Sequence, residues 1–252
     1  MKPLENKIAL ITGAGAGIGH EICKCLAAEG TTIIAVARNK NNLQSLQQQT
    51  GEGNHQYWPI DLSIKEGHDE LLEKLTAFSF PHIVVVNLNI ASARQIVKKM
   101  DEKTFSQNFT ENIDHIFSII NPSLSFQKNE GYGRWIGISS IASHTGIPGQ
   151  AVYNARKAAM ESLFKNIAVE EGRNGITSNI VEAGIIATPT IHTKISDEHF
   201  AAISKCNVMK RAGTPLEVAS AVGFLASPGA SYITGATIPV NGGIYLAWNF
   251  LP

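Results

Sequence analysis

The stretch that decides the fold is Lys7-Ile8-Ala9-Leu10-Ile11-Thr12-Gly13-Ala14-Gly15-Ala16-Gly17-Ile18-Gly19. It joins an apolar run typical of a buried strand to a glycine cluster and then to a helical pattern at 18–29. Glycines at such a junction permit positive φ and let the backbone approach a pyrophosphate, which a helix N-terminus favours. We therefore predict a nucleotide-binding loop with Gly13, Gly15, Gly17 and Gly19 as binding residues. An ordinary tight turn is the alternative.

Outward from this loop, short apolar runs alternate with amphipathic stretches along the whole chain. Further strand-like runs lie at 31–37, 57–62, 83–87, 134–139, 176–183 and 236–240, and helical patterns lie near 39–50, 64–77, 101–127, 151–171 and after Thr214-Pro215. Apolar strands separated by helices predict a parallel sheet with helices on both faces. The expected fold class is α/β, a Rossmann-type doubly wound parallel sheet of about seven strands.

The length and the absence of a linker-like segment predict one domain spanning residues 1–252. The chain has 252 residues, of which 44% are hydrophobic and 17% charged, so a large core can form in a single unit. The least periodic part is 186–212, which is rich in Thr, His, Lys and Ser. Such a segment is expected to form a substrate lid, and a plain surface excursion is the alternative.

The charge balance and the cysteine usage exclude several classes of protein. Twenty-one Lys and Arg residues face 21 Asp and Glu residues, and this zero net charge argues against a nucleic-acid or membrane partner. Apolar runs are too short to span a bilayer and no secretory signal is visible, which favours a cytoplasmic protein. Three cysteines and eight histidines show no disulfide framework and no metal motif, so no metal site is predicted.

The end of the second strand indicates which nicotinamide cofactor would bind. A carboxylate there usually holds the ribose 2′-hydroxyl of NAD, but the sequence places Arg38 at this position. Because a guanidinium pairs well with a phosphate, Arg38 favours NADP(H), unless it is only a solvated cation. Asp61 and Leu62 end the third strand and are expected to contact the adenine. A helix cap is the competing interpretation of Asp61.

A tyrosine and a lysine four residues apart form the candidate catalytic pair. Tyr153 and Lys157 lie on one face of the predicted helix, and a cation near a phenol favours the phenolate. Proton transfer to a carbonyl oxygen would then be feasible near neutral pH. Ser140, at the end of the preceding strand, could donate a hydrogen bond to the same oxygen. Ser139 is the competing serine, although it fits the strand better.

Together these motifs resemble the short-chain dehydrogenase/reductase family. The resemblance covers about residues 4–243 and includes a closing segment, Ile233-Thr234-Gly235 with Val240-Asn241-Gly242-Gly243. It is closest to the 3-oxoacyl-(acyl-carrier-protein) reductases. The Tyr-x-x-x-Lys spacing, rather than a six-residue gap, is unlike the enoyl reductase branch.

The resemblance implies an NADPH-dependent reductase that converts a carbonyl to a secondary alcohol. It makes Tyr153 the general acid, Lys157 the residue that holds the nicotinamide ribose, Ser140 the residue that orients the carbonyl and Asn112 the support of a water relay. It also implies cofactor contacts through Ile18, Asn87, Tyr153, Lys157, Gly184, Ile186 and Thr188. A small-molecule or acyl-thioester substrate and a homotetramer or homodimer are expected by the same resemblance.

Three departures from the family pattern leave other functions open. Asn89 replaces a glycine and is expected to place a side chain beside the cofactor ribose, Ala183 replaces a proline, and Asn241 replaces an aspartate. A dehydrogenase of sugars, steroids or other small secondary alcohols is one alternative. A nucleotide-binding regulatory protein without catalysis is the other.

Overall fold

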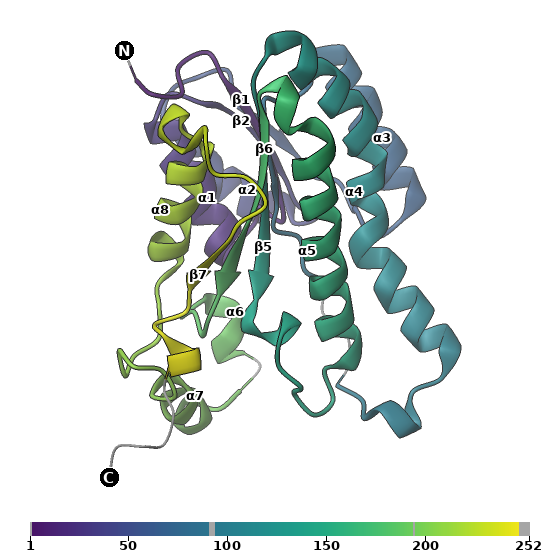
Figure 1. The fold of residues 1–252 in the computed structure, drawn as a ribbon, viewed down its shortest axis with the longest axis vertical. Coiled ribbons are helices and arrows are strands. Elements are labelled where there is room, and N and C mark those ends of the chain that lie inside the picture. Colours follow the sequence, from purple (N-terminus) through teal and green to yellow (C-terminus); the bar gives the residue numbers. More distant parts are fainter. Residues whose placement is uncertain (1, 91–93, 194, 247–252) are drawn as a thin grey trace.

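The fold is built around one parallel sheet of seven strands. The computed structural model describes residues 2–90, 94–193 and 195–246, and the strands follow the order β3-β2-β1-β4-β5-β6-β7 (Figure 1). Their bounds are β1 (Ile8–Thr12), β2 (Thr32–Val36), β3 (Gln56–Trp58), β4 (Ile83–Val86), β5 (Gly133–Ser140), β6 (Ile176–Ala183) and β7 (Thr237–Val240). The predicted doubly wound α/β fold is confirmed.

Helices cover both faces of the sheet and bury two apolar cores. On one face lie α1 (Gly17–Ala28), α2 (Lys40–Gln47) and α8 (Pro215–Ala226), and on the other lie α3 (Lys65–Phe78), α4 (Glu102–Glu130) and α5 (Ala151–Glu171). The central strands are buried on both sides, and β4 has four buried residues out of four. Burial of both faces explains why these strands are continuous apolar runs in the sequence.

The strand order reverses between β1 and β4, and this reversal positions the site. β1 pairs with β2 on one side and with β4 on the other, so the connections leave in opposite directions at its carboxyl end. The Thr12 hydroxyl accepts hydrogen bonds from the backbone N–H groups of Asn87 and Leu88, both at 3.1 Å, and so links the two strand ends. A crevice at such a switch point is where ligands bind in open α/β sheets.

Two parts of the chain differ from the sequence-based expectation. β3 ends at Trp58 because Pro59 has no N–H to continue the ladder, so Asp61 and Leu62 follow the strand instead of ending it. The segment 186–212 contains α6 (Pro189–His192) and α7 (Asp197–Ser204). Both helices are too short to produce a clear hydrophobic period.

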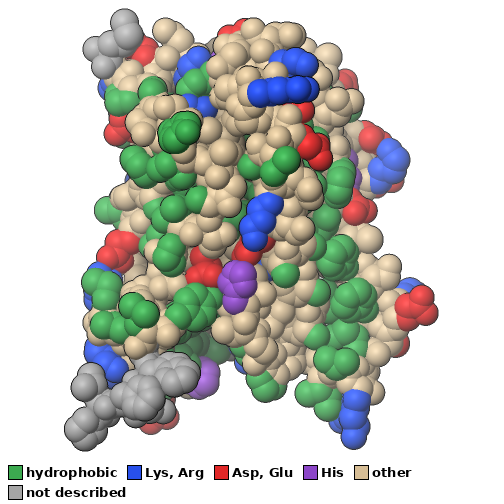
Figure 2. All heavy atoms as spheres, viewed as in Figure 1, with side chains coloured by type: hydrophobic (Ala, Val, Ile, Leu, Met, Phe, Trp, Pro, Cys, Tyr) green, Lys and Arg blue, Asp and Glu red, His purple; other side chains and the backbone are tan. Residues whose placement is uncertain are grey.

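The surface agrees with the neutral composition. Lys, Arg, Asp and Glu side chains are scattered over the face shown in Figure 2, and no large patch of one sign forms there among the described residues. In the described part of the chain, no helix combines the length and apolar character needed to cross a bilayer.

Candidate active site

The glycine loop leads from β1 into α1 and opens toward the crevice. Gly13 and Gly17 have φ values of 68° and 57°, a region that favours glycine. A Cβ on Gly19 would lie 2.3 Å from the Gly13 carbonyl oxygen, so no side chain fits there. No side chain caps the N-terminus of α1 at Ala16. The free N–H groups of a helix N-terminus suit a pyrophosphate, so this loop fits the predicted dinucleotide.

A pocket of about 440 Å³, here called the inner pocket, lies at the carboxyl ends of β1, β4, β5 and β6. Most of the predicted site residues line it: Gly13, Gly17, Ile18, Asn87, Ser140, Tyr153, Lys157, Gly184, Ile186 and Thr188. Sequence reasoning missed two further lining residues, Leu88 and Ile138, and did not single out Ile191 within the segment 186–212. Leu88 and Ile138 are close sequence neighbours of predicted residues at the strand ends, and this was the only signal for them.

The other predicted residues lie outside the inner pocket. Gly15 and Gly19 pack against the protein itself: a Cβ on Gly15 would lie 3.1 Å from the Ala37 Cβ. Leu62 is buried, with an exposed fraction of 2%. These residues shape the loop and the core, and their contact with a cofactor stays a prediction.

Arg38 and Asp61 face one another after β2 and β3. The Arg38 Nη1 lies 3.8 Å from the Asp61 Oδ2, and the Arg38 side chain is 62% exposed. Burial alone would raise the pKa of Asp61, but hydrogen bonds from the Ser63 hydroxyl and N–H, with the charge of Arg38, lower it overall. The Arg38 guanidinium therefore keeps most of its donors available at the rim of the sheet.

Asn112 is buried, and each polar atom of its side chain makes one hydrogen bond. Its Oδ1 accepts a hydrogen bond from the Ile90 N–H at 2.7 Å, and its Nδ2 donates to the Asn108 carbonyl oxygen at 3.0 Å. These bonds fix the segment that follows β4. The predicted role of Asn112 in a water relay stays a prediction.

Tyr153 and Lys157 come together on α5 as the spacing predicts. Tyr153 is partly exposed, and the Lys157 Nζ lies 6.0 Å from the centroid of its ring. The same Nζ donates to the Ile138 carbonyl oxygen at 2.6 Å. Burial, followed by the charge of Arg156, lowers the pKa of Lys157 to about 7, while Glu161 opposes the shift. Lys157 is thus a buried amine that changes charge near neutral pH.

The two candidate serines have different environments. The Ser139 hydroxyl donates to the buried Glu161 carboxylate at 2.5 Å, which commits it to the protein interior. The Ser140 Oγ accepts only a long hydrogen bond, 3.3 Å from the Ala142 N–H, and its own proton has no partner in the described structure. Ser140 can therefore donate to a bound carbonyl.

A second pocket of about 560 Å³, here called the outer pocket, adjoins the inner one. The two pockets share Asn89, Ser140, Tyr153, Gly184, Ile185 and Ile191. Ile195 and Ile203, from the segment 186–212, line its far side. Most of its wall is apolar, but Arg94 and Arg156 also line it. A molecule in the outer pocket could present a carbonyl to Ser140 and Tyr153.

Asn89 lines the inner pocket, as expected of a side chain beside the cofactor, and it also binds Arg156. Its Oδ1 accepts from the Arg156 Nη2 at 2.5 Å, while the Arg156 Nη1 donates to the Ile90 carbonyl oxygen at 2.8 Å. Sequence reasoning did not single out Arg156. Its position three residues after Tyr153 on one helix was the available signal.

His144 contacts two buried carboxylates instead of lining either pocket. Its Nε2 lies 3.2 Å from Glu161 Oε2 and 3.6 Å from Glu182 Oε2, and its side chain is 52% exposed. Asn241 and Tyr245 donate to Glu182 at 2.8 and 2.9 Å. Burial, followed by this carboxylate, raises the pKa of Tyr245 above its usual range.

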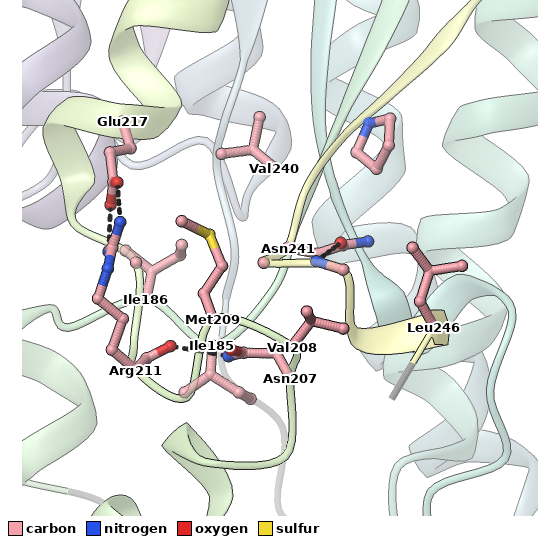
Figure 3. Close-up of a pocket in the computed structure, with 14 residues that line it drawn as sticks. Ile185, Ile186, Asn207, Val208, Met209, Arg211, Glu217, Val240, Asn241 and Leu246 are labelled. Carbon is pink, nitrogen blue, oxygen red and sulfur yellow. Dashed lines mark hydrogen bonds and ion pairs between the residues drawn. The ribbon is translucent and has the colours of Figure 1, made fainter. Parts of the chain in front are cut away.

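A third pocket, of about 450 Å³, shares Ile185 and Ile186 with the inner pocket, and Figure 3 shows the residues that line it. Arg211 and Glu217 form an ion pair of 2.6 Å on one side of it, and Asn207 binds the Arg211 carbonyl oxygen at 2.7 Å. Arg211 and Glu217 neutralise one another, whereas the buried Asn207 Oδ1 has no hydrogen-bond partner in the described structure. Within residues 2–90, 94–193 and 195–246, no group of three or more metal-ligating side chains is placed to hold an ion.

Known proteins match this chain over nearly its whole length. Residues 13–245 match the family model described as "Enoyl-(Acyl carrier protein) reductase". The 3-oxoacyl-(acyl-carrier-protein) reductase FabG of Haemophilus influenzae is 34% identical over 97% of this chain and 100% of its own length. The acetoacetyl-CoA reductase of an Acinetobacter species is 32% identical over 96% of this chain and 99% of its own.

Solved structures agree with these sequence relatives. A "short chain dehydrogenase/reductase family protein" superposes with a TM-score of 0.87 at 32% identity and covers 97% of this chain and 99% of its own. A structure described as a "putative betaketoacyl-ACP reductase" gives a TM-score of 0.85 at 32% identity over 96% and 99% of the two chains. The chain therefore belongs to the short-chain dehydrogenase/reductase family of enzymes, which use a nicotinamide cofactor.

Proposed function

We propose that this enzyme uses NADPH to reduce the carbonyl of a 3-oxoacyl thioester to a secondary alcohol. The observation that carries the proposal is the shared wall of the two pockets, where Ser140 and Tyr153 face both the glycine loop side and the apolar outer pocket. A carbonyl held at this wall would meet two hydroxyl donors. The names of the curated relatives supply the substrate class.

The residues of this chain would perform the proton chemistry. The nicotinamide, when bound in the inner pocket, supplies a hydride to the carbonyl carbon. The Ser140 hydroxyl donates to the carbonyl oxygen and orients it, and the Tyr153 hydroxyl gives its proton to the same oxygen as negative charge develops there. The Lys157 Nζ lies 6.0 Å from the centroid of the Tyr153 ring, and the charged form of Lys157 stabilises the resulting phenolate.

The choice of NADPH rests on Arg38 and on the absence of a carboxylate at the end of β2. Arg38 is exposed beside the crevice, and its guanidinium can pair with a 2′-phosphate. Asp61, which could bind a ribose hydroxyl instead, already accepts from Ser63. Cofactor contacts of the glycine loop, Asn87, Gly184, Ile186 and Thr188 are part of the same proposal.

The domain and assembly predictions belong with this function. The apolar side chains that 186–212 contributes to the outer pocket support its role as a substrate lid on one domain of residues 1–252. Assembly as a homotetramer or homodimer stays a prediction from the family resemblance, and location in the cytoplasm stays a prediction from the apolar patterning of the sequence.

The substitution Tyr153→Phe tests the proposed reaction. Loss of the proton donor should reduce turnover of acetoacetyl thioester with NADPH by about a hundredfold or more, while NADPH binding persists. Tyr232→Phe, which removes a hydroxyl from a fully exposed tyrosine, is the matched control and should leave turnover unchanged. Wild-type turnover in Tyr153→Phe would refute the mechanism. Reduction of a crotonyl thioester, but not of the acetoacetyl thioester, would instead indicate an enoyl reductase.

A further inference from the structure

Arg156 is a buried cation at the edge of the substrate pocket. Only 3% of the residue is exposed, yet it lines the outer pocket together with Tyr153 and Ser140. Burial lowers the pKa of Arg156, but a guanidinium stays charged in proteins. The fold therefore places a permanent positive charge beside the candidate catalytic tyrosine.

The partners of this guanidinium are neutral: two oxygen atoms accept hydrogen bonds from it, its Cζ lies over the face of the Tyr153 ring at 5.1 Å from the centroid, and its buried Nε has no partner in the described structure. The two accepting atoms are the Asn89 Oδ1 and the Ile90 carbonyl oxygen. In the described part of the chain Arg156 forms no ion pair, and Glu111 attracts it only at longer range. Burying a charge without a counter-ion is unfavourable, and a ligand oxyanion in the outer pocket would supply the missing partner.

Among the described residues that line the outer pocket, the arginines contribute positive charge and no side chain contributes negative charge. Arg94 lines the same pocket and makes no hydrogen bond or ion pair with another described residue, and no Asp or Glu is among the described lining residues. The rest of the wall is dominated by isoleucine side chains. This combination suits a ligand with a short apolar body and a negative end.

The geometry places that negative end close to the reacting group. The Arg156 Cζ lies 5.1 Å from the centroid of the Tyr153 ring. A carbonyl at the Tyr153 hydroxyl and an oxyanion at the guanidinium would therefore be separated by only a few bonds. We infer that the natural substrate is an oxo compound with a carboxylate a few bonds from its carbonyl, bound by Arg156 and Arg94.

The inference rests on the proposed function and narrows it. Within the 3-oxoacyl thioesters it selects acyl chains that end in a carboxylate. Asn89 is then a positioning residue, because its Oδ1 accepts a hydrogen bond from the Arg156 Nη2 and so fixes the orientation of the guanidinium. The competing explanation is that Arg156 only ties α5 to the segment after β4.

A matched pair of substrates distinguishes these explanations. The N-acetylcysteamine thioesters of 3-oxohexanoic and 3-oxohexanedioic acid have chains of equal length and differ only in a terminal methyl or carboxylate. We expect wild-type kcat/KM with NADPH to be about tenfold or more higher for the carboxylate, the gain of a charge-assisted hydrogen bond. Equal or lower kcat/KM for the carboxylate would overturn the inference. Turnover of neither thioester would contradict the proposed function instead.

Substitutions of the two arginines test whether they cause the preference for the carboxylate substrate. Arg156→Met, Arg156→Lys and the exposed Arg94→Gln should each reduce the ratio of the two kcat/KM values at least about threefold, mainly through KM of the carboxylate substrate. Arg94→Gln keeps the test valid if the Arg156 variants do not fold. The control is Arg173→Gln, an exposed arginine before β6 at the opposite end of the sheet, and it should preserve the ratio. An unchanged ratio in every pocket variant would refute the assignment.

A binding measurement gives an answer that does not depend on turnover. With NADP⁺ present, millimolar hexanedioate should raise the melting temperature of the wild type more than neutral hexanediamide does, and Arg94→Gln should lose the difference. No difference in the wild type would overturn the inference. A comparison of acetoacetyl-CoA with the acetoacetyl N-acetylcysteamine thioester tests whether the anion that the arginines bind is a phosphate, because only the CoA thioester carries one. An arginine-dependent preference only within that pair would show that the anion is a phosphate of the carrier arm, against the carboxylate assigned here.

Discussion

At the scale of single residues, Arg38 bears most directly on cofactor choice. Its contact with Asp61 is 3.8 Å long and its side chain is 62% exposed. Such exposed pairs contribute little free energy, so a phosphate would meet little competition for the guanidinium. The Arg38 side chain makes no hydrogen bond within the described structure, which leaves its N–H donors available for a ligand.

Arg38→Leu should therefore change the preference between the two nicotinamide cofactors. Loss of charge-assisted hydrogen bonds to a 2′-phosphate should raise KM for NADPH about tenfold or more, with little effect on KM for NADH. Steady-state kinetics with both cofactors measure the change, and Lys40→Leu, an exposed cation two residues away, is the control. An equal rise in KM for both cofactors would show that Arg38 does not bind the 2′-phosphate of NADPH.

The individual site residues were predictable to different degrees. Tyr153, Lys157 and Ser140 could be found because helical spacing and the end of an apolar strand fix their positions locally. The pairing of Asn89 with Arg156 could not, because it depends on where the segment after β4 meets α5 in space. Sequence spacing carries no information on that contact.

At the scale of elements, His144 joins the ends of several of them. It follows the short helix 141–143 after β5, and its ring reaches Glu161 on α5 and Glu182 on β6. Ser139, Asn241 and Tyr245 donate to the same carboxylates. These contacts hold the carboxyl ends of β5, β6 and β7 next to α5, which carries Tyr153 and Lys157.

His144→Ala should destabilise the protein because it removes a partner of two buried carboxylates. We expect a loss of about 1–3 kcal/mol in the free energy of unfolding, measured by urea denaturation at pH 6.5. Adding Glu182→Gln removes one of the two charges that His144 contacts, so the double variant should lose less than the sum of the single variants. Strict additivity would show that the histidine and Glu182 do not interact.

Sequence patterns predicted long elements better than short ones. The helix 151–171 was predicted with its observed ends, since a periodic segment of that length is unambiguous. The short helices α6 and α7 were missed because one or two turns show no period, and the end of β3 was misplaced beyond Pro59. The wall that the segment 186–212 contributes to the outer pocket consists of just such short elements, so its shape required the structure.

At the scale of the whole molecule, the buried charges of the site make folding stability depend on pH. Lys157 has a pKa of about 7 in the folded protein, against about 10.4 for an unfolded lysine. Between these values the unfolded chain binds more protons than the folded one, so the free energy of unfolding rises with pH. The cost of burying the ammonium is fully present below about pH 7 and disappears above about pH 10.4.

Lys157→Met should remove this contribution, and comparison with the wild type isolates it from all other titrating groups. Without cofactor, the variant should gain stability relative to the wild type as pH falls from 9.5 to 7.5, by about 1 kcal/mol for each pH unit. Loss of the hydrogen bond to the Ile138 carbonyl oxygen adds an offset that is the same at every pH. Urea denaturation of both proteins across this range measures the difference. Parallel pH profiles would mean that the folded protein keeps Lys157 charged throughout, and therefore that Glu161 and bound water compensate the burial.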